Sequence, residues 1–127
     1  MTYLLDNDIS FRFAPMLAAL AVEVVAVRDV EDLGEDSPDV EILQWLKGRE
    51  RVVVTADKHI RSRPAEIAAL KESGVTALFL ERFWAKLDFW QQAAWLVGRW
   101  PRIVQFTASV TPGTCAAIQQ RGRILLL

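Results

Sequence analysis

The sequence contains very little cysteine or histidine, and this scarcity limits the sites that the chain can build. Its 127 residues include one cysteine, Cys115, and one histidine, His59. A single cysteine cannot form an internal disulfide and is not a framework for a metal site, so we infer a reducing compartment. His59 lies far from Cys115 in the sequence, and we therefore expect Cys115 to be structural rather than nucleophilic.

The sequence also lacks long apolar runs and a strong excess of one charge. No apolar run approaches the roughly 20 residues of a membrane helix, and no basic segment followed by an apolar core opens the chain. We therefore expect a cytoplasmic protein that does not enter a membrane. The formal net charge is -1, which excludes the global basic field typical of many nucleic-acid binders. Contacts to nucleic acid would have to depend on local charge.

More than half of the residues, 52%, are hydrophobic, which suits one globular domain over residues 1–127. Segments rich in β-branched residues alternate with segments of helical spacing. The expected strands are Tyr3–Leu5, Glu23–Val27, Val52–Thr55, Thr76–Leu80 and Ile103–Thr107. The alternation predicts an α/β fold of three layers, in which a mostly parallel central sheet is flanked by helices.

Four helices are expected between and after these strands. The first begins around Arg12, because Pro15 is tolerated only in the first turn of a helix. The later ones are a helix capped by Ser37 that begins at Pro38 and ends near Gly48, a helix over Pro64–Ser73 closed by Gly74, and a helix over Asp88–Trp100. Helical spacing places Phe13, Met16, Leu17 and Leu20 on one face of the first helix, and Trp90, Ala93, Ala94 and Val97 on one face of the last.

Carboxylates follow several of the predicted strands. Asp6 and Asp8 come just after the first strand, Asp57 comes just after the third, and Asp39 lies in the first turn of the second helix. Each acid also has a purely structural explanation, as a turn or capping residue. In a parallel sheet these positions meet at one edge, where grouped carboxylates repel one another unless a cation compensates. Mg²⁺ or Mn²⁺, which take oxygen ligands, would fill this role. Glu81, after the fourth strand, is a weaker candidate for the same edge.

Basic residues lie next to these acids in the sequence. The segment DKHIRSR places Lys58, His59 and Arg61 directly after Asp57, and Arg12 follows the first pair of acids. Cations at these positions suit contacts to the phosphates of a nucleic acid, although an exposed basic loop explains them equally well. The local pattern therefore combines a candidate metal site with candidate phosphate contacts.

Three segments together, LLDNDIS, SPDVEIL and RVVVTADKHI, resemble the PIN-like nucleases, especially the compact bacterial group related to VapC-type toxins. The resemblance is close over Tyr3–Ile60. It implies a metal-dependent endoribonuclease that cleaves single-stranded RNA, and a toxin silenced by a cognate antitoxin protein. By position, it assigns Asp6, Asp39 and Asp57 as catalytic metal ligands and Thr55 as a hydrogen-bonding support, with Asp8 in a secondary role. Many relatives read DKDF where this chain reads DKHI, so the fourth acid stays open.

The sequence leaves other functions open. The segment LLDND also fits the strand and Asp-x-Asp of phosphatases of the haloacid dehalogenase type, but the later lysine and paired acids are not evident. A catalytically decayed PIN-like domain that acts as a binding or assembly module is the other alternative. A group of large aromatic residues lies in and around the last helix. We expect most of them to pack in the core or cover the sheet, and the rest to offer a surface for a homodimer or an antitoxin. The members of this group are Phe83, Trp84, Phe89, Trp90, Trp95 and Trp100.

Overall fold

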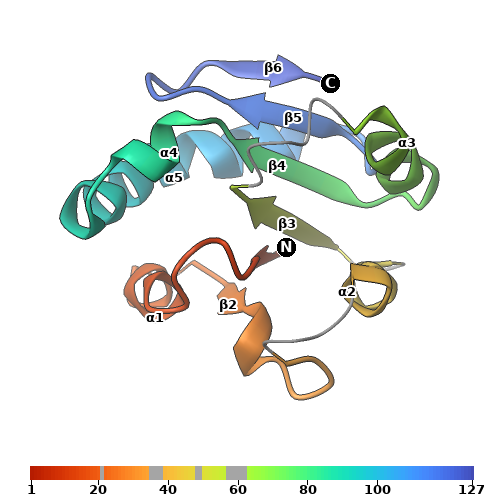
Figure 1. The fold of residues 1–127 in the computed structure, drawn as a ribbon, viewed down its shortest axis with the longest axis horizontal. Coiled ribbons are helices and arrows are strands. Elements are labelled where there is room, and N and C mark those ends of the chain that lie inside the picture. The colour runs from red at the N-terminus through yellow and green to blue at the C-terminus, as the bar shows by residue number, and fades with distance from the viewer. Residues whose placement is uncertain (21, 35–38, 48–49, 57–62) are drawn as a thin grey trace.

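The computed structural model describes residues 1–20, 22–34, 39–47, 50–56 and 63–127, and the side chains of residues 39 and 40 lie outside this description. Figure 1 shows a twisted sheet with helices on both faces. The strands, in the order β2-β1-β3-β4-β5-β6, are Val24–Ala26, Thr2–Leu5, Arg51–Thr55, Thr76–Leu80, Cys115–Ile118 and Ile124–Leu126. All neighbouring strands pair in parallel except β5 and β6, which are antiparallel. The predicted mostly parallel α/β sheet is confirmed.

The side chains of each strand point alternately to the two faces of the sheet, and this divides the apolar core into two clusters. One core cluster joins residues such as Leu5, Val54 and Leu78 to the helices α1 (Phe13–Ala18), α4 (Phe83–Lys86) and α5 (Phe89–Ser109). A second joins Leu4 and Val53, on the opposite face, to α2 (Asp39–Leu46) and α3 (Pro64–Glu72). Successive strand side chains point to opposite faces, so the continuous apolar runs of β1, β3 and β4 fill both layers.

The first helix and the second strand are shorter than predicted. The helix α1 begins after Arg12 and places Pro15 in its first turn, as expected. It ends at Ala18, so Leu20 is not part of its apolar face and is 55% exposed. The strand β2 ends at Ala26, because a short 3₁₀ helix, η1 (Val27–Asp29), takes over the end of the predicted strand. The predicted cap and first residue of the next helix, Ser37 and Pro38, lie outside the described residues.

The prediction of a strand over Ile103–Thr107 is wrong. These residues continue α5, which runs through Pro101 to Ser109. The helix is favoured because Leu96, Trp100, Ile103 and Thr107 recur at helical spacing and are all buried against the sheet. The fifth strand of the sheet is Cys115–Ile118, which follows the helix and pairs with β4.

The predicted apolar face of the last helix is also wrong. Trp90 and Val97 are 81% and 43% exposed, so the face that they share with Ala94 points to solvent. The buried face contains Trp95, Leu96 and Trp100 instead. The helix is apolar on much of its circumference, and its contact with the sheet decides which apolar face is buried. Of the helices in the described part of the chain, none has the length and hydropathy that crossing a bilayer requires.

Candidate functional site

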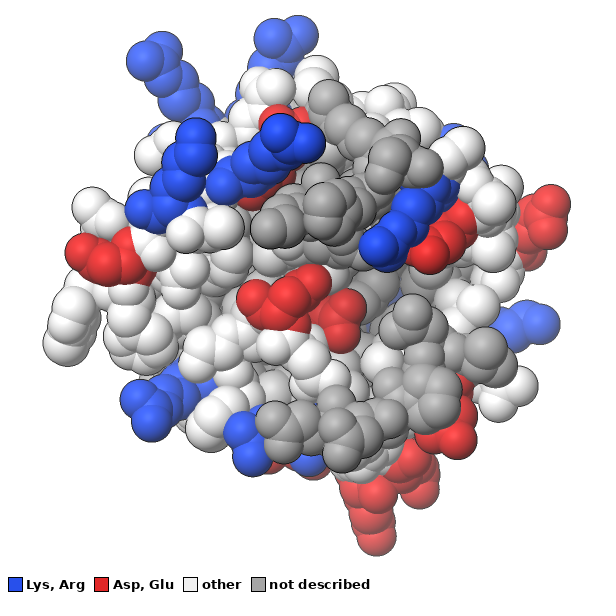
Figure 2. Space-filling model, in the orientation of Figure 1, with Lys and Arg blue, Asp and Glu red and all other residues white. Residues whose placement is uncertain are grey.

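The carboxyl ends of β1, β3 and β4 lie side by side at one edge of the sheet. Leu5 at the end of β1 is level with Val54, and Thr55 at the end of β3 is level with Phe79. The chain after β1 therefore passes directly beside the end of β3, and the backbone N–H of Asp6 donates to the Val54 carbonyl at 3.0 Å. Figure 2 shows acidic side chains near the middle of the face viewed, with lysine and arginine side chains around them.

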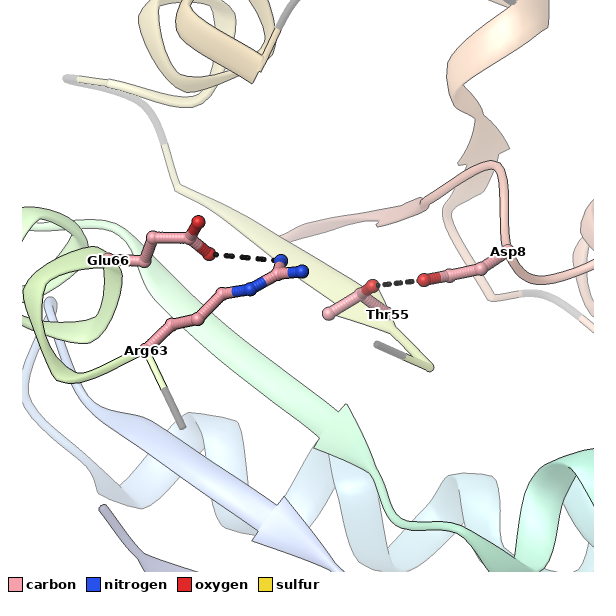
Figure 3. A network of polar contacts seen from close by, with 4 residues as sticks. All are labelled: Asp8, Thr55, Arg63 and Glu66. Atoms are coloured by element: carbon pink, nitrogen blue, oxygen red, sulfur yellow. Dashed lines mark hydrogen bonds and ion pairs between the residues drawn. The ribbon is translucent and has the colours of Figure 1, made fainter. Parts of the chain in front are cut away.

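Asp8 ties the loop after β1 to the end of β3. One carboxylate oxygen accepts a hydrogen bond from the Thr55 hydroxyl at 2.8 Å, and the other accepts one from the Ala56 backbone N–H at 3.0 Å. Figure 3 shows the Asp8 side chain pointing at Thr55 across the gap between the loop and the strand. Because Thr55 is buried, its hydroxyl needs an internal partner, and the carboxylate provides one. We name these three residues, Asp8, Thr55 and Ala56, the clamp.

Asp6 occupies a tight turn between β1 and the clamp. Its carboxylate accepts a hydrogen bond of 2.8 Å from the N–H of Asn7, and its carbonyl accepts one of 3.0 Å from the N–H of Ile9. Ile9 is buried, which anchors the far side of the turn in the core. The half-buried Asp6 is therefore held at the edge by backbone bonds on both sides.

Glu81 reaches the same edge from β4. Its backbone N–H donates to the Ile118 carbonyl at 3.1 Å, and its own carbonyl accepts from the N–H of Trp84 at the start of α4. Because β4 neighbours β3, Glu81 lies on the opposite side of β3 from Asp6 and Asp8. The side chain is half-buried. The structure thus places acids on both sides of the end of β3.

Several predicted site residues lie outside the described residues. They are Asp57, Lys58, His59 and Arg61. The backbone of α2 begins at Asp39, which agrees with an acid in the first turn of that helix, but the Asp39 side chain is not described. Within the described part of the chain, no three or more His, Cys, Asp or Glu side chains are grouped closely enough to hold a metal ion. The described acids alone therefore do not form a complete metal site.

Basic and aromatic side chains surround the edge. Arg12 is exposed, and its backbone N–H donates to the Ser10 hydroxyl at 3.3 Å. Arg63, immediately before α3, forms an ion pair of 3.7 Å with Glu66 (Figure 3). The Arg28 guanidinium lies 4.1 Å from the centre of the Phe11 ring. Sequence reasoning missed this last pair, because Phe11 lies in the loop after β1, Arg28 lies in η1, and no spacing rule links them.

Cys115 is buried in β5, on the face of the sheet that α2 and α3 cover. Burial raises the pKa of its thiol, and the charge of Lys71 opposes this rise only in part. A raised pKa keeps the thiol protonated at neutral pH, and a protonated thiol is a poor nucleophile. The structure therefore supports the structural role expected for this residue.

A protein-family model matches the larger part of the chain. A family model described as a PIN-like domain matches residues 1–82, which is 82 of the 127 residues. The match includes the strands β1 to β4, the clamp, and both Asp6 and Glu81. No curated protein and no solved structure matches the sequence.

Proposed function

The chain belongs to the PIN-like domain family, and from this premise we propose that it is a metal-dependent endoribonuclease that cleaves single-stranded RNA. Domains of this family are generally nucleases. The clamp is the observation that carries the proposal. It holds the Asp6 turn against the end of β3 at Thr55 and Ala56. Asp57 is the next residue in the sequence, and we propose that it adds a further acid to this edge.

The donor chemistry of this edge suits Mg²⁺ or Mn²⁺. The described donors, Asp6, Asp8 and Glu81, offer carboxylate oxygens, which are the ligands that hard divalent cations prefer. We propose Asp6, Asp39 and Asp57 as the principal ligands, with Glu81 as the candidate fourth acid. When bound, such a cation would polarise a phosphate oxygen and lower the pKa of a bound water.

We assign Asp8 mainly a positioning role. Both of its carboxylate oxygens accept hydrogen bonds from the end of β3, so its geometry is set by the clamp. A carboxylate oxygen has further lone pairs, and a secondary contact to the metal is compatible with these bonds. Thr55 would then act through Asp8, by fixing the carboxylate that orients the loop containing Asp6.

Basic residues supply the substrate contacts in this proposal. Arg12 is exposed at the start of α1, within the segment that follows the acids. We propose that it contacts phosphates of the RNA together with Lys58 and Arg61, with a weaker contribution from His59. These cations would offset the repulsion between a polyanionic substrate and the acidic edge.

The family resemblance also suggests a biological setting, which we propose as toxin activity controlled by a cognate antitoxin in the cytoplasm. Trp90 is 81% exposed on α5, and the partly exposed Phe89 lies beside it. Large exposed aromatic residues are favoured at the centres of protein interfaces. We propose this part of α5 as the surface for the antitoxin or for a second copy of the chain.

Cleavage of a mixture of single-stranded RNAs by purified protein tests the nuclease activity. The assay compares Mn²⁺, Mg²⁺ and a chelator, for wild type, Asp6→Asn and Asp57→Asn. We expect cleavage only with metal, and a loss of at least about 100-fold in either variant, because each removes a charged ligand. Glu72→Gln, which changes an exposed acid of α3, serves as the matched control and should keep full activity.

The outcomes separate the alternatives. Equal cleavage by wild type and both variants would indicate a contaminating nuclease or a wrong site. If wild type and all variants are folded and none cleaves RNA, the result would contradict the proposed nuclease activity and favour a decayed binding domain. An acid-stable phosphoryl group on an aspartate after incubation with a phosphate donor would point to the haloacid dehalogenase type instead.

A further inference from the structure

Phe11 is an exposed aromatic residue with arginine guanidinium groups next to its ring. The ring is 40% exposed, whereas Phe13, two residues later, is buried in the core. The Arg28 guanidinium lies 4.1 Å from the ring centroid, and that of Arg12 lies 6.0 Å away. Both distances are within the range of cation–π contacts. Arg28 thus organises the ring without burying it.

This pair belongs to the same edge as the clamp. Phe11 lies in the loop after β1, and Arg28 lies in η1, directly after β2. Since β1 and β2 are parallel neighbours, with Leu5 level with Ala26, both residues follow strand ends at the same edge of the sheet. Phe11 is three positions after Asp8 in the sequence, which limits the distance between their Cα atoms to about 11 Å. The backbone of Phe11 is therefore close to that of Asp8 in the clamp.

An aromatic ring and a guanidinium plane are the two protein groups on which the bases of single-stranded RNA commonly stack. The guanidinium is planar and weakly hydrated, so it can stack on a ring while it keeps its charge. An ammonium group is compact and strongly hydrated, and it stacks less well. An exposed ring held by such a cation offers a flat, electropositive surface beside an acidic edge. This combination suits a nucleotide whose phosphate points toward the cations and whose base lies flat on the ring.

We propose that Phe11 and Arg28 form a stacking platform for one base of the RNA, adjacent to the scissile phosphate. The proposal rests on the proposed nuclease function for the identity of the ligand. Every base has a π face, so the platform would give affinity and position with little sequence preference. Phe11 and Arg28 are then substrate-positioning residues that hold the strand across the edge where Asp6 and Asp8 lie.

The test is binding of a six-nucleotide single-stranded RNA that contains the fluorescent base 2-aminopurine, in the presence of a chelator so that no cleavage occurs. Stacking quenches this fluorophore, so the same titration reports both affinity and stacking. We expect Phe11→Ala to weaken binding between about 5-fold and about 150-fold and to remove the quenching. Phe11→Trp should retain both, because it keeps an aromatic surface.

Two further variants separate stacking from charge. Arg28→Lys keeps the positive charge but loses the planar group, so a stacking role predicts weaker quenching with similar salt dependence. Leu20→Ala removes an exposed apolar side chain beyond the end of α1 and should bind like wild type. Circular dichroism and thermal unfolding check that every variant is folded.

Wild-type affinity and quenching in a folded Phe11→Ala protein would overturn the platform, and so would a wild type that does not bind the oligonucleotide. These results are distinct from those of the cleavage assay. Metal-dependent cleavage with unchanged binding in Phe11→Ala would keep the nuclease and reject the platform. Phe11-dependent binding without cleavage would keep the platform and reject the nuclease.

Discussion

The Asp8 carboxylate accepts a hydrogen bond of 2.8 Å from the Thr55 hydroxyl, although 47 positions separate the two residues in the sequence. This bond joins the loop after β1 to the end of β3, and the Ala56 N–H reinforces it. It holds the loop that contains Asp6 and Asp8 against Thr55 and Ala56 at the end of β3.

The hydrogen bond between Asp8 and Thr55 should be measurable as a coupling energy. A double-mutant cycle with Asp8→Ala and Thr55→Val, followed by urea unfolding, should give about 1 kcal/mol, because a hydrogen bond to a charged group is strong but Asp8 is exposed to water. Thr55→Ser, which keeps a hydroxyl, is the control and should lose less stability than Thr55→Val. A coupling energy near zero would show that the clamp does not hold the loop in solution.

Tyr3, the only tyrosine of the chain, should make the stability fall at alkaline pH. Burial raises its pKa above the ordinary value of 10.0, and the hydrogen bond to Thr107 opposes this rise in part. Above pH 10 the unfolded chain therefore loses the phenol proton before the folded protein does. The contribution of Tyr3 is complete below pH 10 and is lost as the pH rises from there through the folded pKa.

The comparison with Tyr3→Phe isolates this effect, because the lysines that titrate in the same range are common to both proteins. Tyrosinate absorbance near 295 nm gives the folded pKa, and urea unfolding at several pH values gives the stability. Below pH 10 we expect the variant to be less stable by about 1 kcal/mol, since it loses the 2.6 Å hydrogen bond to Thr107. The difference should shrink above pH 10, and a constant difference would argue against the raised pKa.

Pro101 should destabilise α5. It lies within the helix and is exposed, and without an N–H it cannot donate to the carbonyl of Val97. Pro101→Ala should increase the free energy of unfolding by about 1 to 3 kcal/mol, measured as a higher urea midpoint. Pro101→Gly restores the N–H without the helix preference of alanine and should gain less. A lower midpoint for Pro101→Ala would show that packing of α5 depends on a local distortion at the proline.

A fragment of residues 1–82, the part that matches the family model, should not fold. It ends after β4 and lacks Trp95, Leu96, Trp100 and Ile103, which fill the core on one face of the sheet. It also leaves β4 as an edge strand, because β5 is absent. We expect no cooperative urea unfolding and no near-ultraviolet circular dichroism from the fragment, in contrast to residues 1–127. Cooperative unfolding of the fragment would contradict our expectation that residues 1–127 form one domain.

The sequence determined the part of the fold in which local signals agree. The β-branched run before Thr55 and the apolar segment before Asp6 predicted β3 and β1, and Gly74, at a φ of 72°, closes α3 as expected. Parallel topology then predicted that Asp6 and Asp8 lie at the carboxyl edge near the end of β3. These features depend on short-range spacing and on one topological rule, so they can be predicted from a single sequence.

Only the tertiary structure decided which face of α5 is buried and where the fifth strand lies. The segment around Pro101 is apolar on several faces, so its local pattern suits a helix or a strand, and packing against the sheet selects the helix. The same holds for the two contacts that shape the candidate site. Asp8 with Thr55, and Phe11 with Arg28, each join segments far apart in the chain, and a pairing at such a distance depends on the assembled sheet rather than on local sequence.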